Sequence, residues 1–309
     1  MNKITFYLLA ALYAVSVLCG IILLTRKQPL HKADNNPATI SFSKNTVAVI
    51  QIYGPIYISQ SPSGLFRGAD SVVRRLHKLN SRDDVKAVVL RINSPGGSVA
   101  AVQEICDEVN LLRKNKKIVV TSMGDVTASG GYYIASQSDR IIADKGTLTG
   151  SIGVIIQLAN VQELFRKVGV RMETIRTGPF KDIGSPFREL TPQERQLFQG
   201  LIDDSYNQFV DAVAQGRKMD RAKVLKLADG RVFTGIQAKD AGLIDDFGNS
   251  EEAIRVAAGM AGIKGTPTVI GDTGYFDRFL QIFNNSTSDV KIVSDLLANR
   301  KIRLDYMLE

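Results

Sequence analysis

Two glycine-rich segments, each of which follows a run of β-branched residues, are the first places in this sequence where chemistry could occur. Ser94-Pro95-Gly96-Gly97-Ser98 follows one run, and Ala128-Ser129-Gly130-Gly131 follows another. Glycine lets backbone amides approach a ligand closely, and two such amides can stabilise an oxyanion beside a serine that starts a helix. Neither segment has the glycine spacing of a phosphate or dinucleotide loop. A Gly-Gly pair after a strand is more often a simple turn, so the segments need a base to become an active site.

The sequence offers few bases for a serine nucleophile, because it contains only two histidines. His31 lies in a polar segment near the N-terminus and His77 lies in a candidate surface helix, so a Ser-His-Asp triad is disfavoured. A desolvated lysine can replace histidine, since burial lowers the pKa of its amine. Lys181 lies among Gly, Pro and Phe just after a candidate strand. A single lysine is usually a solvated surface charge, which is the competing interpretation.

The N-terminus predicts a membrane anchor. Residues 4–25 are uncharged and apolar, and as a helix they would span about 33 Å, the thickness of a bilayer core. The run is longer than the apolar part of a signal peptide and has no small-x-small cleavage site after it. We expect an anchor over 1–27 and a polar linker over 28–45. The positive charges after the run slightly favour a cytoplasmic body, although long domains cross membranes largely regardless of charge.

Composition describes the remainder as a globular protein. Of 309 residues, 44% are hydrophobic, and two cysteines exclude a disulfide-stapled scaffold. The net charge is +8, and residues 1–45 contribute five basic residues against one acidic residue. The body shows no block of mixed basic and aromatic residues, so we expect no nucleic-acid partner. The sequence also shows no cluster of metal ligands, and we expect neither a metal nor a cofactor.

The body alternates strands and helices, which predicts an α/β fold with parallel strand pairing. From Thr191 onward the pattern becomes mainly helical, and Thr191-Pro192-Gln193-Glu194 is typical of a helix start. Residues 264–309 are polar and only weakly periodic, with possible helices at 275–284 and 290–298. We predict strands at 46–53, 86–93, 117–121, 140–143, 154–157 and 171–176, and helices at 70–79, 99–112, 161–168, 191–216 and 220–229.

Five segments together resemble the short, single-domain form of the signal peptide peptidase A family, membrane-anchored serine peptidases with a Ser–Lys dyad. The resemblance covers roughly residues 46–260. It implies a ClpP/crotonase-like superhelical fold with repeated β-β-α units over 46–262, followed by a C-terminal extension over 263–309. The segments are INSPGG (92–97), TASGGYYIAS (127–136), TGSIGV (149–154), GPFKDIGSPFRELT (178–191) and FTGIQAKDAGLID (233–245).

The resemblance also implies roles for individual residues. Ser129 matches the nucleophile, Lys181 the general base, and Ser151 a serine that orients this lysine. The backbone amides of Gly97 and Gly130 match the oxyanion hole.

The remaining candidates have simpler interpretations. Asp182 would oppose Lys181 as a base if its carboxylate faced the amine, so we expect it to point away. Ser94, Ser98 and Ser136 are expected in turns and caps, Cys106 in the core, and Lys145 in an exposed turn.

The resemblance further implies peptide substrates, in particular cleaved signal peptides, and homo-oligomers that enclose the active sites. It implies a single-pass protein of the bacterial inner membrane with an extracytoplasmic catalytic body, against the slight preference of the flanking charges. Three alternatives stay open: a Ser–Lys peptidase of the same fold acting on stomatin-like or other membrane proteins, a crotonase-type acyl-CoA enzyme, and an inactive scaffold.

Overall fold

The computed structural model describes residues 45–58, 68–271 and 305–308. The predicted anchor, its linker up to residue 44 and the possible helices at 275–284 and 290–298 lie outside these residues. Within the described ranges, no helix is long and apolar enough to cross a membrane. The strands are β1 (Thr46–Tyr53), β2 (Val85–Ser94), β3 (Gly96–Ser98), β4 (Ile118–Ala128), β5 (Arg140–Ala143), β6 (Leu148–Gly150), β7 (Val232–Thr234), β8 (Asp246–Phe247), β9 (Thr268–Ile270) and β10 (Asp305–Met307). The helices are α2 (Ala69–Asn80), α3 (Val99–Lys114), α4 (Gly130–Ser136), α5 (Gln162–Lys167), α6 (Pro192–Gly216), α7 (Arg221–Leu225), α8 (Gly235–Ala241) and α9 (Ser250–Met260).

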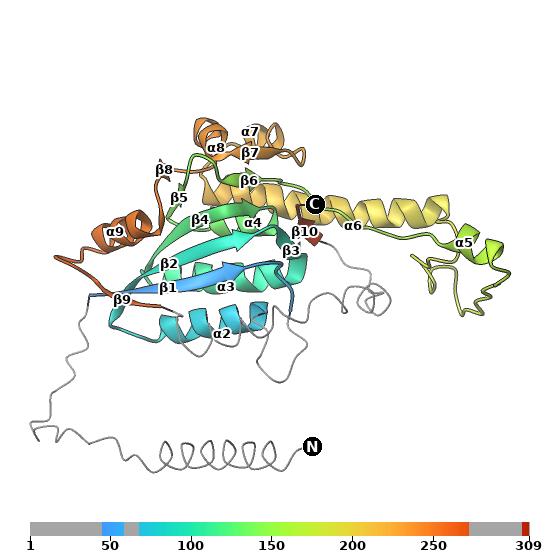
Figure 1. Ribbon diagram of the computed structural model, residues 1–309, viewed down its shortest axis with the longest axis horizontal. Helices are drawn as coiled ribbons and strands as arrows, with labels where there is room; N and C mark the ends of the chain where they lie inside the picture. Colours follow the sequence, from blue (N-terminus) through green and yellow to red (C-terminus); the bar gives the residue numbers. More distant parts are fainter. Residues whose placement is uncertain (1–44, 59–67, 272–304, 309) are drawn as a thin grey trace, which may run out of the picture. The chain divides into compact units, whose positions relative to one another are not determined.

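The main sheet has the strand order β7-β6-β4-β2-β1-β9, with β5 beside β4 and β8 beside β5 (Figure 1). All of these pairs are parallel except β6 with β7. The predicted α/β fold with parallel pairing is therefore confirmed. Strand β9, which lies in the segment predicted as a C-terminal extension, pairs with β1 at one edge of this sheet.

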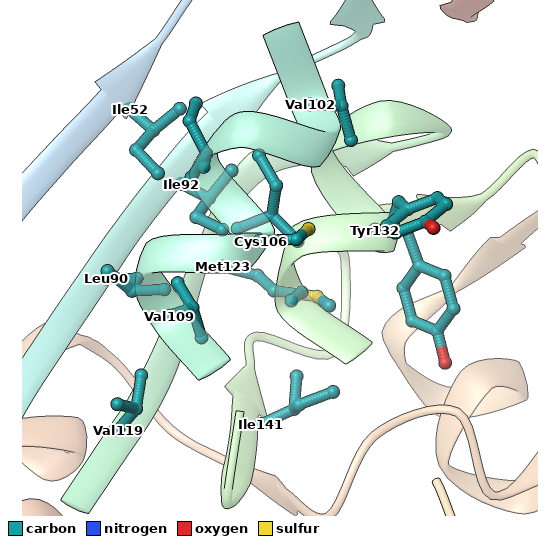
Figure 2. Packing of buried hydrophobic residues seen from close by; sticks show 14 of the residues in the cluster. Ile52, Leu90, Ile92, Val102, Cys106, Val109, Val119, Met123, Tyr132 and Ile141 are labelled. Carbon is teal, nitrogen blue, oxygen red and sulfur yellow. The ribbon is translucent and has the colours of Figure 1, made fainter. Parts of the chain in front are cut away.

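Helices cover both faces of the sheet because β2 is apolar on both sides. Leu90 and Ile92 face the larger core, which α2, α3, α4 and α6 complete, whereas Ala87 and Val89 face α9. Figure 2 shows Val102, Cys106 and Val109 of α3 and Tyr132 of α4 packed in this larger core. Cys106 is therefore a core residue, as predicted, and so are the two tyrosines after the second glycine pair.

Helix α6 begins where the sequence indicates. Thr191 accepts a hydrogen bond from the backbone N–H of Glu194, and the Glu194 carboxylate accepts one from the backbone N–H of Thr191. These reciprocal bonds satisfy two amide donors that a helix start otherwise leaves unpaired. Helix α6 contacts α4, so its start connects the long C-terminal helix to the region of the second glycine pair.

Two predicted strands are wrong. Residues 154–157 form only an isolated bridge between Ile155 and Asp305, and residues 171–176 form no strand. A strand needs a neighbour to pair with, and the segment 155–190 has no adjacent strand within the described part of the chain beyond that bridge. The predicted helix at 220–229 is shorter than expected and ends at Leu225.

Candidate active site

Ser129 lies at the junction of β4 and α4 in a strained backbone conformation. Residues other than glycine rarely adopt its backbone angles, a φ of 51° and a ψ of −118°. The sharp turn arises because its backbone N–H donates to the carbonyl of Gly150 at 2.8 Å while its own carbonyl accepts from Tyr133. This strand–turn–helix junction is the geometry that holds a nucleophilic serine in other hydrolases.

The hydroxyl of Ser129 is buried without a partner. The residue is 1% exposed, and its Oγ has no hydrogen bond among the described residues. Buried hydroxyls are normally hydrogen-bonded, so an exception on a strained residue indicates a functional role. The nearby Cys106 thiol is no competing nucleophile, because burial raises its pKa well above the usual value.

The structure brings the two glycine pairs together at Ser129. A Cβ atom placed on Gly130 would lie 3.2 Å from the amide nitrogen of Gly97, and one on Gly96 would lie 2.8 Å from the amide nitrogen of Gly130. Backbone can approach backbone this closely only where side chains are absent. The amides predicted to stabilise an oxyanion are therefore neighbours.

Ser151 is also close to this junction, since β4 and β6 are parallel partners that end together. Ala128 is paired with Gly150, so Ser129 and Ser151 each follow one member of the same pair. Ser151 has a positive φ of 50°, and its backbone N–H donates to the carbonyl of Arg231. Ser151 lines a cavity of about 510 Å³. Ile155 also lines it, as do Asp203 and other residues of α6 and residues of the loops that follow.

Lys181 is not joined to Ser129 within one chain. It lies exposed in a turn between α5 and α6, and no side-chain hydrogen bond or ion pair of Lys181 occurs among the described residues. The carboxylate of its neighbour Asp182 instead contacts Arg176 and Arg188, as expected for a group that points away from Lys181. These two guanidinium groups hold the pKa of Asp182 well below its usual range, with the Arg188 hydrogen bonds as the main cause.

The histidines do not replace Lys181. His77 is exposed on α2, where its Nδ1 lies 3.3 Å from Oε1 of Glu108 on α3. This contact belongs to the outer surface of the α2–α3 pair, as predicted for a surface helix. His31 lies outside the described residues.

Strand β10 near the C-terminus lies across the glycine pair, which the sequence did not predict. Tyr306 is the antiparallel partner of Gly97, and its carbonyl oxygen would be 1.9 Å from a Cβ on Gly96 and 3.1 Å from one on Gly130. The backbone N–H of Leu308 donates to the carbonyl of Pro95 at 2.8 Å. No strand was predicted here, because residues 264–309 are polar and only weakly periodic.

The side chain of Tyr306 fills an aromatic pocket beside Ser129. Its ring is stacked on Tyr133 at 5.3 Å between centroids and contacts Phe209 at 4.8 Å. Its hydroxyl donates to the backbone carbonyl of Ser205 at 2.8 Å. Burial raises the pKa of Tyr133 to about 12, so this phenol of the pocket stays neutral. The pocket therefore accepts a large apolar side chain and offers a hydrogen-bond acceptor at its far end.

An α/β fold with a buried, strained serine and a neighbouring pair of glycine amides defines a serine hydrolase of the ClpP/crotonase-like type, and a Clp protease profile matches residues 58–146. A profile of peptidase family S49 matches residues 111–264. The chain is 46% identical over 196 residues to a Synechocystis protein provisionally named a protease, covering 63% of this chain and 70% of that protein. The chain thus belongs to peptidase family S49 and is a serine peptidase similar to the signal peptide peptidases.

Two further relatives differ in length from this chain. Protease 4 of Haemophilus influenzae is 35% identical over 257 residues, which cover 83% of this chain but only 40% of that protein. An Enterococcus faecium protein provisionally named signal peptide peptidase SppA is 41% identical over 180 residues, covering 58% of this chain and 52% of that protein. The peptidase assignment removes the acyl-CoA enzyme and the inactive scaffold from the alternatives.

Proposed function

We propose that this protein is a membrane-anchored serine endopeptidase that uses Ser129 and Lys181 to degrade cleaved signal peptides in or near the membrane. The observation that carries the proposal is the position of β10. An extended segment lies antiparallel to β3, with the carbonyl of Tyr306 beside the glycine pairs and the side chain of the same residue in an apolar pocket. A substrate peptide that added a strand to β3 would take the same place.

The reaction follows from this placement. The neutral amine of Lys181 removes the proton from Ser129 Oγ, which attacks the carbonyl carbon of the bound peptide. The amides of Gly97 and Gly130 donate to the oxyanion. Lys181 then protonates the leaving amine, and a water molecule that loses its proton to Lys181 hydrolyses the acyl ester. Ser151 orients the lysine amine.

The base in this proposal comes from a second copy of the chain. Ser129 Oγ is buried and unpartnered, while Lys181 is exposed on the segment 155–190. That segment also exposes large apolar side chains, including Ile175 at 97%, Phe180 and Met172. The presence of several exposed large apolar side chains in one segment supports its burial against another protein. Enclosure between two copies would exclude water from the amine and favour its neutral form.

The membrane attachment rests on the sequence alone. The uncharged run over 4–25 is the anchor, and we place the body on the extracytoplasmic side of a bacterial inner membrane. Protease accessibility of the body in intact spheroplasts tests this placement, and a protected body would contradict it.

A mixing experiment tests the dyad. Ser129→Ala and Lys181→Ala are each expected to abolish cleavage of a fluorogenic apolar peptide and to retain their folds. Co-assembly of the two inactive variants should restore activity, because some interfaces then pair an intact Ser129 with an intact Lys181 of the neighbouring copy. Mass spectrometry after labelling with a serine-directed fluorophosphonate should locate the adduct on Ser129.

The outcomes separate the parts of the proposal. Wild-type turnover in either single variant would remove that residue from the mechanism. Two inactive variants without restoration would assign the dyad to one chain. Cleavage of intact membrane proteins but not of signal peptides would support the alternative substrate class.

A further inference from the structure

Arg188 joins the turn that carries Lys181 to the start of α6. Its Nε and Nη2 donate to the two carboxylate oxygens of Asp182 at 2.9 and 2.8 Å. Its Nη1 donates to Oε2 of Glu194 at 2.8 Å, and its Nη2 also donates to Oε1 of Glu194. One guanidinium group therefore binds two carboxylates, each through both oxygens.

The first partner of Arg188, Glu194, is buried at the start of α6. The side chain of Glu194 is 1% exposed and also closes the capping box of α6 through the backbone N–H of Thr191. Arg188 holds the pKa of Glu194 at about 2, so the carboxylate stays charged at neutral pH. Because α6 contacts α4, Arg188 connects the lysine turn to the helix framework that also contacts the Ser129 junction.

The second partner of this arrangement is the turn that carries Lys181. Lys181 is next to Asp182 in the chain, and the turn is otherwise closed by short-range backbone bonds, among them Lys181 N–H to the Gly178 carbonyl at 3.3 Å and Ser185 N–H to the Asp182 carbonyl at 3.0 Å. Within the described ranges, the Lys181 side chain has no partner that would fix it. The contacts of Asp182 are therefore the nearest side-chain restraints on the base.

The arrangement also binds the Asp182 carboxylate, which could otherwise form an ion pair with Lys181. The Asp182 carboxylate forms ion pairs with two guanidinium groups, those of Arg176 and Arg188. A free carboxylate at this position could form an ion pair with the Lys181 ammonium and keep that amine charged. Lysine could not replace Arg188 here, because a point charge cannot bind two carboxylates with planar, bidentate geometry.

We propose that Arg188 is a positioning residue of the peptidase, which holds the Lys181 turn against the start of α6 and keeps Asp182 away from the lysine amine. This inference rests on the proposed role of Lys181 as the base. Arg188 itself does not touch the substrate or the reacting atoms.

A double-mutant cycle tests the inference on the full chain in detergent. The rate of Ser129 phosphonylation by a fluorophosphonate is measured for the wild type, Arg188→Gln, Lys181→Ala and the double variant. Arg188→Gln should slow the reaction about 10-fold or more, since small displacements of a catalytic group are costly. In the Lys181→Ala background the same change should alter the rate less than about twofold, because the group that Arg188 positions is already absent.

Further variants separate positioning from folding. Arg188→Lys keeps the charge and should remain close to Arg188→Gln in rate. Arg255→Gln removes the exposed ion pair with Glu252 on α9, outside the Lys181 segment, and should react like the wild type. If Arg188→Gln does not fold or assemble, Asp182→Asn replaces it, because this change leaves the Arg188–Glu194 contacts in place. Asp182→Asn should slow phosphonylation in the wild-type background and should not slow it in the Lys181→Ala background. With a peptide substrate, these losses should appear in kcat and leave KM unchanged.

Each outcome decides one point. A wild-type rate in Lys181→Ala would overturn the proposed function, and the inference with it. A slow Lys181→Ala variant beside a normal Arg188→Gln variant would overturn only the role of Arg188. An equal loss from Arg188→Gln in both backgrounds would show that Arg188 acts on the fold or the peptide groove, which also overturns the inference.

Discussion

Tyr306 of β10 and Gly97 of β3 are antiparallel strand partners, and this pairing places the Tyr306 carbonyl oxygen beside the amides of both glycine pairs. The side chain of Tyr306 is completely buried. The groove that would bind a peptide is therefore already filled by residues 305–308 of the same chain, which must leave before a substrate strand can pair with β3.

Removal of residues 305–309 is expected to increase kcat/KM for a short peptide by about 10-fold, because only the fraction of molecules with an empty groove can bind substrate. Tyr306→Phe loses only the bond to the Ser205 carbonyl and should produce a smaller rise, about fivefold, as one hydrogen bond is worth about 1 kcal/mol. A fluorogenic peptide assay measures both. Lower activity after truncation would instead make β10 a part of the scaffold.

Gly130→Ala should reduce kcat by about 100-fold, the usual effect of disturbing an oxyanion hole. The added methyl group would lie 2.7 Å from Val102 Cγ2 and 3.2 Å from the Gly97 amide nitrogen, so the two glycine segments must separate. Gly259→Ala in α9 is the matched control, since its Cβ meets nothing within 4 Å. The control should keep full activity and gain about 0.5–1 kcal/mol of stability, measured by urea unfolding.

The stability of the protein should decrease as the pH falls from about 5 towards 2, with Glu194 as one contributor. The Arg188 hydrogen bonds lower the pKa of Glu194 from its ordinary 4.5 to about 2 in the folded protein. The unfolded chain therefore binds this proton first, and the stabilisation is present above the unfolded pKa and disappears through this window. Thermal melting of Glu194→Gln should show a lower Tm at pH 7 and a weaker decline between pH 5 and 3. An identical pH dependence in the variant would contradict the assignment.

Arg217→Leu should destabilise the fold by about 3 kcal/mol, since it leaves a partly buried carboxylate without its counter-ion. Arg217 at the end of α6 donates to both oxygens of Asp245, and Asp245 also accepts from the backbone N–H of Ile141. The exposed Arg255–Glu252 pair on α9 offers the comparison, and Arg255→Leu should leave the urea midpoint unchanged. Equal effects of both changes would show that burial does not distinguish the two pairs.

The local signals in the sequence predicted most of the central fold. The β-branched runs at 46–53 and 86–93, the spacing of apolar residues over 99–112 and the capping box at Thr191 are short-range patterns, and the structure confirms each. The predicted strands at 154–157 and 171–176 failed for a complementary reason. Their apolar residues suggested burial, but strand formation depends on a neighbour that a local pattern does not specify.

The sequence by itself indicated which groups could carry the chemistry: two histidines in unsuitable places and two glycine pairs favoured serine, lysine and backbone amides, and the family resemblance assigned them to Ser129, Lys181, Gly97 and Gly130. Only the tertiary structure decided how these groups meet. It placed Ser129, Ser151, Gly97 and Gly130 at one junction, because parallel strands end at the same edge of a sheet, and it left Lys181 exposed. It also placed Tyr306 in the groove and bound Asp182 and Glu194 to Arg188. These contacts join residues through long-range packing and charge pairing, which no local sequence pattern encodes.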